Sequence, residues 1–219
     1  MPNLNLMKLK NILLGIIMAT FIVMFSSCED DVCDVCGLET VEVIELNTKF
    51  GNIFIQLFKE TPIHYRNFDS LINAHFYDST EFHRCVDDFV IQGGSPTSKD
   101  NNRNNDGSGG PGYTLPAEID TTIHKHKYGS LAAARLGNMT NPERRSSGSQ
   151  FYIVTDPDGA SFLDGEYTVF GKVLSGMDVA KIIESQSKNS SGLPDQRIKM
   201  FIRSLSLSRN EATQLGIVL

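Results

Sequence analysis

A histidine and an arginine stand side by side in residues 81–95, which read EFHRCVDDFVIQGGS. Histidine exchanges protons near neutral pH, whereas arginine keeps its charge and presents a planar fork of N–H donors. Alternation with period two predicts a strand in which Arg84 shares a face with Phe82 and Val86. His83 would point the other way. An arginine beside apolar side chains either lies along the surface of an edge strand or forms part of a binding site.

Acid–base chemistry is one use of this stretch. His83 together with Asp87 or Asp88 would suit the proton transfers of a hydrolase. The sequence indicates no nucleophile to accompany them, so hydrolysis fits poorly. The choice between a surface arginine, a binding site and a hydrolase therefore depends on the segments that surround the stretch.

The composition predicts one soluble globular domain. The chain has 219 residues, which is enough for one good core and too few for two. Hydrophobic residues make up 40% of it, and there is no tryptophan. The net charge of -6 provides no basic footprint for nucleic acid, so we expect no nucleic-acid partner.

Short alternating segments separated by turn residues predict a mainly β domain over residues 41–208. Helices are expected over residues 62–74, opened by a capping Thr61 and by Pro62, and over residues 178–185. The total is seven or eight strands without repeated strand–helix–strand units. This pattern favours an antiparallel barrel or sandwich.

Two segments lack any apolar periodicity and are expected to lie outside the sheet. Residues 97–112 read TSKDNNRNNDGSGGPG, which predicts a long surface loop. Residues 209–219 are expected to form a loosely held tail.

The start of the chain predicts export. Lys8 and Lys10 precede an apolar run over residues 12–25, which is too short for an ordinary membrane span. The run ends in FSSC, which resembles a bacterial lipobox, although phenylalanine replaces the common leucine three residues before Cys28. We therefore expect a lipoprotein signal peptide over residues 1–27 and a lipidated Cys28; an uncleaved anchor and a plain secretory signal are the alternatives.

Residues 28–40 are expected to form a flexible tether. Its acidic residues 29–31 resemble a signal that sends some bacterial lipoproteins to the outer membrane or the cell surface. Cys33 and Cys36 form a lone C-x-x-C without the second pair that a zinc ribbon needs. The remaining cysteine, Cys85, lies in the central stretch. We expect no metal and no cofactor.

Four ordered segments resemble the cyclophilin-type peptidyl-prolyl cis-trans isomerases, and the match covers roughly residues 41–207. The segments are FHRCVDDFVIQGG at 82–94, GSLAAAR at 129–135, SGSQFYI at 147–153 and FLDGEYTVFGKV at 162–173. The resemblance implies a closed eight-stranded antiparallel β-barrel capped by two α-helices. It also implies a proline-binding groove on the outer face of the barrel and isomerisation of X-Pro bonds.

The resemblance assigns a role to each site residue. Arg84 matches the catalytic arginine, Gln92 a glutamine that braces it, and His83 a groove wall or polar contact. The implied substrate-binding residues are Phe89, Val90, Ala134, Arg135, Gln150, Tyr152, Phe162, Leu163 and Tyr167.

The chain departs from many eukaryotic members of the family at four of these positions. Phe162 stands where they have tryptophan, and this loss of an indole N–H implies weak cyclosporin binding at most. Tyr152 and Tyr167 replace a phenylalanine and a histidine. Arg135 replaces a frequent asparagine, which should alter the preference for residues that flank the proline.

The expected partners are proline-containing peptides and unfolded exported proteins, with a monomeric domain held at a bacterial envelope membrane by its lipid. The alternative is a membrane-tethered module that binds proline peptides and whose catalysis is incidental. The long loop over residues 97–112 motivates that alternative because such a loop can carry partner contacts.

Overall fold

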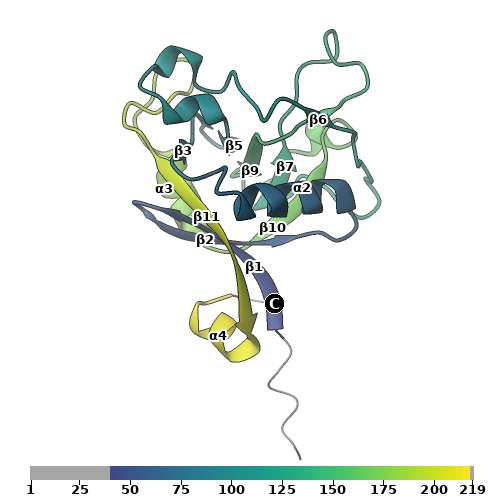
Figure 1. Ribbon diagram of the computed structural model, residues 1–219, viewed down its shortest axis with the longest axis vertical. Coiled ribbons are helices and arrows are strands. Elements are labelled where there is room, and N and C mark those ends of the chain that lie inside the picture. The colour runs from purple at the N-terminus through teal and green to yellow at the C-terminus, as the bar shows by residue number, and fades with distance from the viewer. Residues whose placement is uncertain (1–39, 218–219) are drawn as a thin grey trace, which may run out of the picture. The chain divides into compact units, whose positions relative to one another are not determined.

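The computed structural model describes residues 40–217 (Figure 1). The expected signal peptide, Cys28, the acidic residues behind it, Cys33 and Cys36 lie outside the described residues. Within residues 40–217, no helix has both the length and the apolar character needed to cross a membrane.

Nine strands form one antiparallel sheet, in the order β3-β11-β1-β2-β10-β7-β9-β5-β4. The strands are β1 (Thr40–Thr48), β2 (Gly51–Leu57), β3 (Thr80–Glu81), β4 (Arg84–Val86), β5 (Val90–Gly93), β7 (Ser130–Ala133), β9 (Phe151–Val154), β10 (Val169–Ser175) and β11 (Lys199–Ser208). A separate pair joins β6 (Thr114–Leu115) to β8 (Ser146–Ser147).

The sheet confirms a mainly β, antiparallel domain but not the closed eight-stranded barrel. The sheet has nine strands, and among the described residues its two end strands, β3 and β4, are not paired with each other. The sheet is curled around a core of aliphatic and aromatic side chains, which include Leu46, Ile55, Phe68, Phe151 and Ile153.

The chain passes from one end of the sheet to the other between β3 and β4. The N–H of Phe82 donates to the carbonyl of Ile198 beside β11, and the next N–H, of His83, donates to the carbonyl of Gln92 on β5, both at 3.0 Å. This switch interrupts the alternation. Phe82 packs in the core, whereas Arg84 faces the outside, so the expectation that both share a face is wrong.

Two helices cover the core, α2 (Pro62–Asn73) and α3 (Met177–Glu184). α2 begins at Pro62 as expected, but Thr61 does not cap it. The carboxylate of Glu118 accepts the backbone N–H groups of Ile63 at 3.0 Å and His64 at 2.9 Å. A carboxylate at this end of a helix is favoured by the helix dipole.

A third helix, α4 (Arg209–Gln214), follows the last strand, so the expected loose tail is wrong up to residue 217. Figure 1 shows β1 and β11 running together beyond the other strands, with α4 at their end. Buried Ala212 and Ile217 pack there against Val43 and Phe54. A capping box at Ser208 starts the helix.

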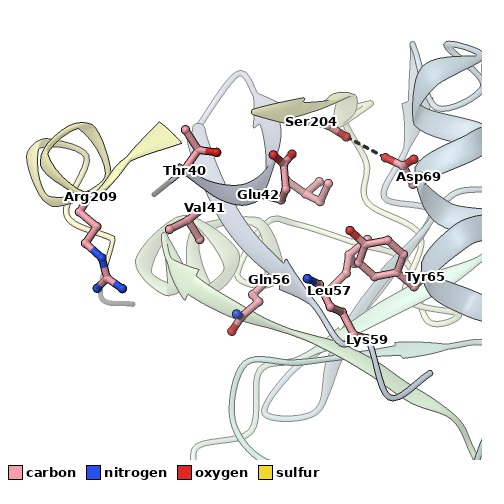
Figure 2. A pocket seen from close by; sticks show the side chains of 11 residues that line it. Thr40, Val41, Glu42, Gln56, Leu57, Lys59, Tyr65, Asp69, Ser204 and Arg209 are labelled. Atoms are coloured by element: carbon pink, nitrogen blue, oxygen red, sulfur yellow. Dashed lines mark hydrogen bonds between the residues drawn. The ribbon is translucent and has the colours of Figure 1, made fainter. Parts of the chain in front are cut away.

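The pairing of β1 with β2 stops at Ile44, whereas its pairing with β11 continues to Thr40. The separation of β1 from β2 leaves a hollow of about 320 Å³ (Figure 2). On its far side Ser204 donates a hydrogen bond to Asp69 of α2 at 3.2 Å. None of the residues expected in the functional site lines this hollow.

Candidate active site

Strand register places a row of side chains on the outer face of the sheet. Arg84 on β4 lies opposite Gln92 on β5, Gln92 lies opposite Tyr152 on β9, and Tyr152 lies opposite Ala132 on β7. Directly paired residues of antiparallel strands project to the same face. The register therefore brings together residues 84, 92 and 152, which are distant in the sequence.

A cavity of about 160 Å³ lies over this row. The expected site residues that line it are Arg84, Phe89, Val90, Gln92, Ala134, Arg135, Tyr152, Leu163 and Tyr167. A second apolar cluster lies on this face, formed by Val90, Ala132, Ala134, Tyr152, Val154, Ala160 and Val169. The cavity thus combines apolar side chains with two arginines, a glutamine and two tyrosines.

Arg84 is half-buried, and no hydrogen bond or ion pair to its guanidinium is found within residues 40–217. The expected brace from Gln92 is not formed among the described residues: the Gln92 amide nitrogen donates to the side-chain oxygen of Gln150 at 3.1 Å, and no hydrogen bond joins the Gln92 side-chain oxygen to Arg84. The N–H donors of Arg84 are therefore not committed to other described side chains and face a cavity with apolar walls.

Gln150 does not line the cavity, but it links the groove to the long loop. Its amide nitrogen donates to the carbonyls of Gly107 and Gly109, both at 2.8 Å. The loop contains two short 3-10 helices, η2 (Pro96–Lys99) and η3 (Arg103–Asn105). The segment expected to be a surface loop is thus folded against the site.

His83 is buried, with 7% of its surface exposed, and lies behind the groove. A Cβ atom at Gly107, where φ is +84°, would lie 2.6 Å from Cδ2 of His83, so only glycine lets the loop approach this closely. Neither ring nitrogen has a hydrogen-bond partner among the described residues. Burial lowers the pKa of His83 to about 4. His83 therefore serves as packing and does not line the cavity.

The acids near His83 do not form a catalytic pair with it. Asp87 pairs with Lys188 at 2.5 Å, and Asp88 pairs with Lys181 at 3.0 Å. Both acids are exposed, whereas His83 is buried. The geometry therefore contradicts a hydrolase built on these residues.

Phe162 and Leu163 lie on the 3-10 helix η4 (Ser161–Leu163), but only Leu163 lines the cavity. Phe162 is 69% exposed and stacks on Phe89, with their ring centroids 5.4 Å apart. Phe162 thus extends the apolar surface outward from the cavity, and the expectation that it lines the pocket is not confirmed.

Arg135 lines the cavity with a guanidinium that is already engaged. Its side chain is 4% exposed; Nε donates to the carbonyl of Glu166 at 2.7 Å, and Nη2 donates to the Glu166 carboxylate at 2.8 Å. Nη1 donates to the carbonyl of Leu136 at 2.9 Å, and the guanidinium lies 4.5 Å from the ring centre of Tyr167. Arg135 is therefore a rigid wall, in contrast to Arg84.

Sequence reasoning missed two residues that support the cavity. Buried His126 bonds through Nδ1 to Asp164 at 2.8 Å and through Nε2 to the Tyr152 hydroxyl at 3.0 Å. If Nδ1 carries the proton, Nε2 accepts from Tyr152. Burial lowers the pKa of His126 and raises that of Tyr152, which favours the neutral form of both. The polar replacement at Tyr152 was the available signal, because a buried hydroxyl needs a partner.

The remaining chemical candidate among the described residues is the thiol of Cys85. Cys85 is buried in the core, and burial raises the pKa of its thiol to about 12. Within the described part of the chain, no group of three or more His, Cys, Asp or Glu side chains could hold a metal ion.

The sequence matches one family model over residues 43–203, that of the cyclophilin type peptidyl-prolyl cis-trans isomerases. Peptidyl-prolyl cis-trans isomerase B of Bacillus subtilis is 44% identical over 115 residues, which cover 52% of this chain and 70% of the relative. The ppi1 isomerase of Schizosaccharomyces pombe is 37% identical over 161 residues, which cover 72% and 94%.

The fold is also similar to that of a solved relative. A cyclophilin type isomerase from Cryptosporidium parvum, crystallised in the presence of the dipeptide Ala-Pro, superposes with a TM-score of 0.65 at 28% identity. The match covers 75% of this chain and 99% of that one. With its curled antiparallel sheet, its outer-face cavity and a family match over residues 43–203, the chain belongs to the cyclophilin-type peptidyl-prolyl cis-trans isomerases, a family of enzymes.

Proposed function

We propose that this protein accelerates rotation about X-Pro peptide bonds, with Arg84 as the catalytic donor. Resonance holds the flat amide planar behind a barrier of roughly 20 kcal/mol. The prolyl nitrogen accepts a hydrogen bond only when the bond is twisted and the resonance is lost. A donor aimed at that nitrogen therefore binds the transition state better than the substrate, which is the requirement for catalysis.

One observation supports this role above the others: Arg84 is a cation with no partner among the described residues, and it shares a cavity with the apolar side chains of Phe89 and Leu163. Apolar walls suit a proline ring, and a low local dielectric strengthens a charged hydrogen bond. Phe89, Val90 and Leu163 would contact the ring, while Gln92, held by its hydrogen bond to Gln150, would contact the peptide backbone.

The exchange of Arg84 for lysine tests the geometry of the donor. Arg84→Lys keeps the charge but replaces the planar fork by a hydrated ammonium, so we expect about a tenfold or greater loss of kcat/KM on proline peptides. Arg144→Lys, at an exposed arginine on the far side of Glu166, is the matched control. Equal rates for the two variants would argue against the role of the fork.

We further propose that the enzyme is exported and held at a bacterial envelope membrane through lipid on Cys28, where it acts on the X-Pro bonds of exported proteins as a monomer. Two or three acyl chains would suffice for stable anchoring. A fatty-acid probe should label the wild-type chain and leave Cys28→Ala unlabelled. An unlabelled wild type would refute the anchor without affecting the proposed catalysis.

Cyclosporin should bind weakly at most. Phe162 offers no indole N–H to the drug, and its ring already stacks on Phe89. Phe162→Trp restores the indole N–H donor and should lower the cyclosporin concentration that inhibits isomerisation. An unchanged inhibitory concentration would show that residue 162 does not determine the affinity for cyclosporin.

A further inference from the structure

A second, open hollow of about 450 Å³ adjoins the cavity that contains Arg84. Arg135 and Tyr167 line both, so the two hollows share a wall. The other residues of the second hollow are Gly137, Asn138, Met139, Thr140 and Glu166. A polypeptide that places its proline in the first cavity continues across the neighbouring surface. The second hollow is part of that surface, because it is continuous with the first cavity.

Most of the polar groups in the hollow are already paired inside the protein. Arg135 donates to Glu166 and to a backbone carbonyl. The second carboxylate oxygen of Glu166 forms an ion pair with Arg144 at 3.0 Å, and the Thr140 hydroxyl donates to the carbonyl of Gly137 at 3.2 Å. A polar ligand would have to compete with these bonds, and such competition lowers its affinity.

The surface that remains available is largely apolar. Met139 is fully exposed, with a relative exposure of 101%, on a loop that is otherwise mostly polar. Its flexible thioether adapts to different apolar partners. Tyr167 lines the hollow, and the guanidinium of Arg135 lies over its ring, 4.5 Å from the ring centre. A single exposed methionine is ordinary by itself, but this one adjoins the substrate cavity.

We infer that the hollow beside Met139 binds an apolar side chain of the substrate polypeptide, from a residue near the isomerised proline. The inference rests on the proposed function and adds a substrate class to it: proline segments with a large apolar neighbour. Tyr167 and the engaged Arg135 form the floor, and Met139 closes over the bound side chain.

The test compares two sets of proline peptides on the full chain. One set carries leucine at each of the two positions before and after the proline in turn, and the other carries glycine throughout. Wild type should favour leucine at one position, and Met139→Ser should lower kcat/KM for that peptide by about three- to tenfold. The rate on the glycine peptide should not change.

Ile123→Ser is the matched control, because Ile123 is also exposed and lines neither hollow. It should behave as wild type. An equal loss on leucine and glycine peptides would assign Met139 a structural role, and no loss on either would exclude the hollow; each result overturns the inference. Dissociation constants of the same peptides test the hollow separately from the isomerase activity. If wild type binds the leucine peptide more tightly than the glycine peptide and Met139→Ser loses this preference, the hollow is supported even when wild type isomerises neither peptide.

Discussion

Arg84 and Arg135 line the same cavity but are suited to different tasks. Arg135 directs its donors to Glu166 and to a backbone carbonyl, and it stacks on Tyr167. Arg84 has no such acceptors within residues 40–217. A guanidinium whose three nitrogens all donate within the protein holds its neighbours in place, whereas one without such acceptors can bind an incoming group. We therefore expect Arg135, which replaces the frequent asparagine, to shape the groove and not to donate to the peptide.

The hydroxyl of Tyr152 gives a test at the scale of one atom. Tyr152→Phe leaves Nε2 of His126 buried without its donor, so we expect a loss of about 1–2 kcal/mol in the free energy of unfolding. Tyr167→Phe is the matched control, since the Tyr167 hydroxyl has no hydrogen-bond partner in the described part of the chain and its ring lines the same cavity. Urea unfolding measures both. Equal losses would contradict a specific role for His126.

His83 predicts a pH dependence of stability. Burial lowers its pKa to about 4, below the value of roughly 6.5 expected in the unfolded chain, so the unfolded state binds more protons between these values. Stability from this group is complete above pH 6.5 and is lost as the pH falls toward 4. The loss amounts to at most about 3 kcal/mol.

The measurement compares wild type with His83→Gln, which cannot titrate, by urea unfolding at pH 7 and pH 4. The decline between these values should be steeper for wild type. Parallel curves for wild type and His83→Gln would show that the buried imidazole contributes nothing to the acid sensitivity.

The sequence predicted which side chains line the cavity better than it predicted their partners. Alternation within a strand determines the face of a residue, and the motifs placed Arg84, Phe89 and Tyr152 in one groove. The pairing of His126 with Asp164 joins two loops 38 residues apart and has no periodic signal. The switch between Phe82 and Arg84 was also invisible, because alternation cannot show that a strand ends and another begins.

At the scale of elements, the loop over residues 97–112 is a structural support of the groove. Its polar composition predicted a long surface loop of the kind that can carry partner contacts. In the structure its carbonyls hold Gln150, Gly107 packs on His83, and Arg103 donates to the carbonyls of Asp195 and Pro194 at 2.8 and 2.5 Å. Deletion of the loop would therefore disturb the groove as well as any partner contact, so it cannot separate binding from catalysis.

Helix α4 is the element that composition missed, and one substitution tests its packing. Ala212 is fully buried against the end of the β1–β11 pair. Ala212→Asp would bury a charge or detach the helix, so we expect a loss of about 1–3 kcal/mol in the free energy of unfolding. Thr213→Asp introduces the same charge on the exposed side of the same turn and should cost less. Thermal or urea unfolding measures both losses. Equal losses for Ala212→Asp and Thr213→Asp would contradict the packing of α4 against the sheet.

At the scale of the whole domain, the curled sheet uses both of its faces. β5, β7 and β9 direct Ile91, Leu131 and Ile153 into the core, and they direct Val90, Ala132 and Tyr152 into the apolar cluster beside the cavity. Strands buried on both faces read as continuous apolar runs, which predicted β9 as a strand, whereas the small residues of β7 were equally compatible with a short helix. The nine-stranded order with unpaired ends was not predictable, because β3 has only two residues and carries too little pattern.

The central claim is that Arg84 donates to the twisted prolyl amide. The most direct measurement is the isomerisation rate of an X-Pro peptide by exchange NMR, with wild type beside Arg84→Ala, the latter verified as folded by circular dichroism. A charged hydrogen bond contributes roughly 1.5–3 kcal/mol, so we predict a fall in rate of about ten- to a hundredfold, with the fold intact. A folded Arg84→Ala variant that isomerises the peptide as fast as wild type would contradict the account.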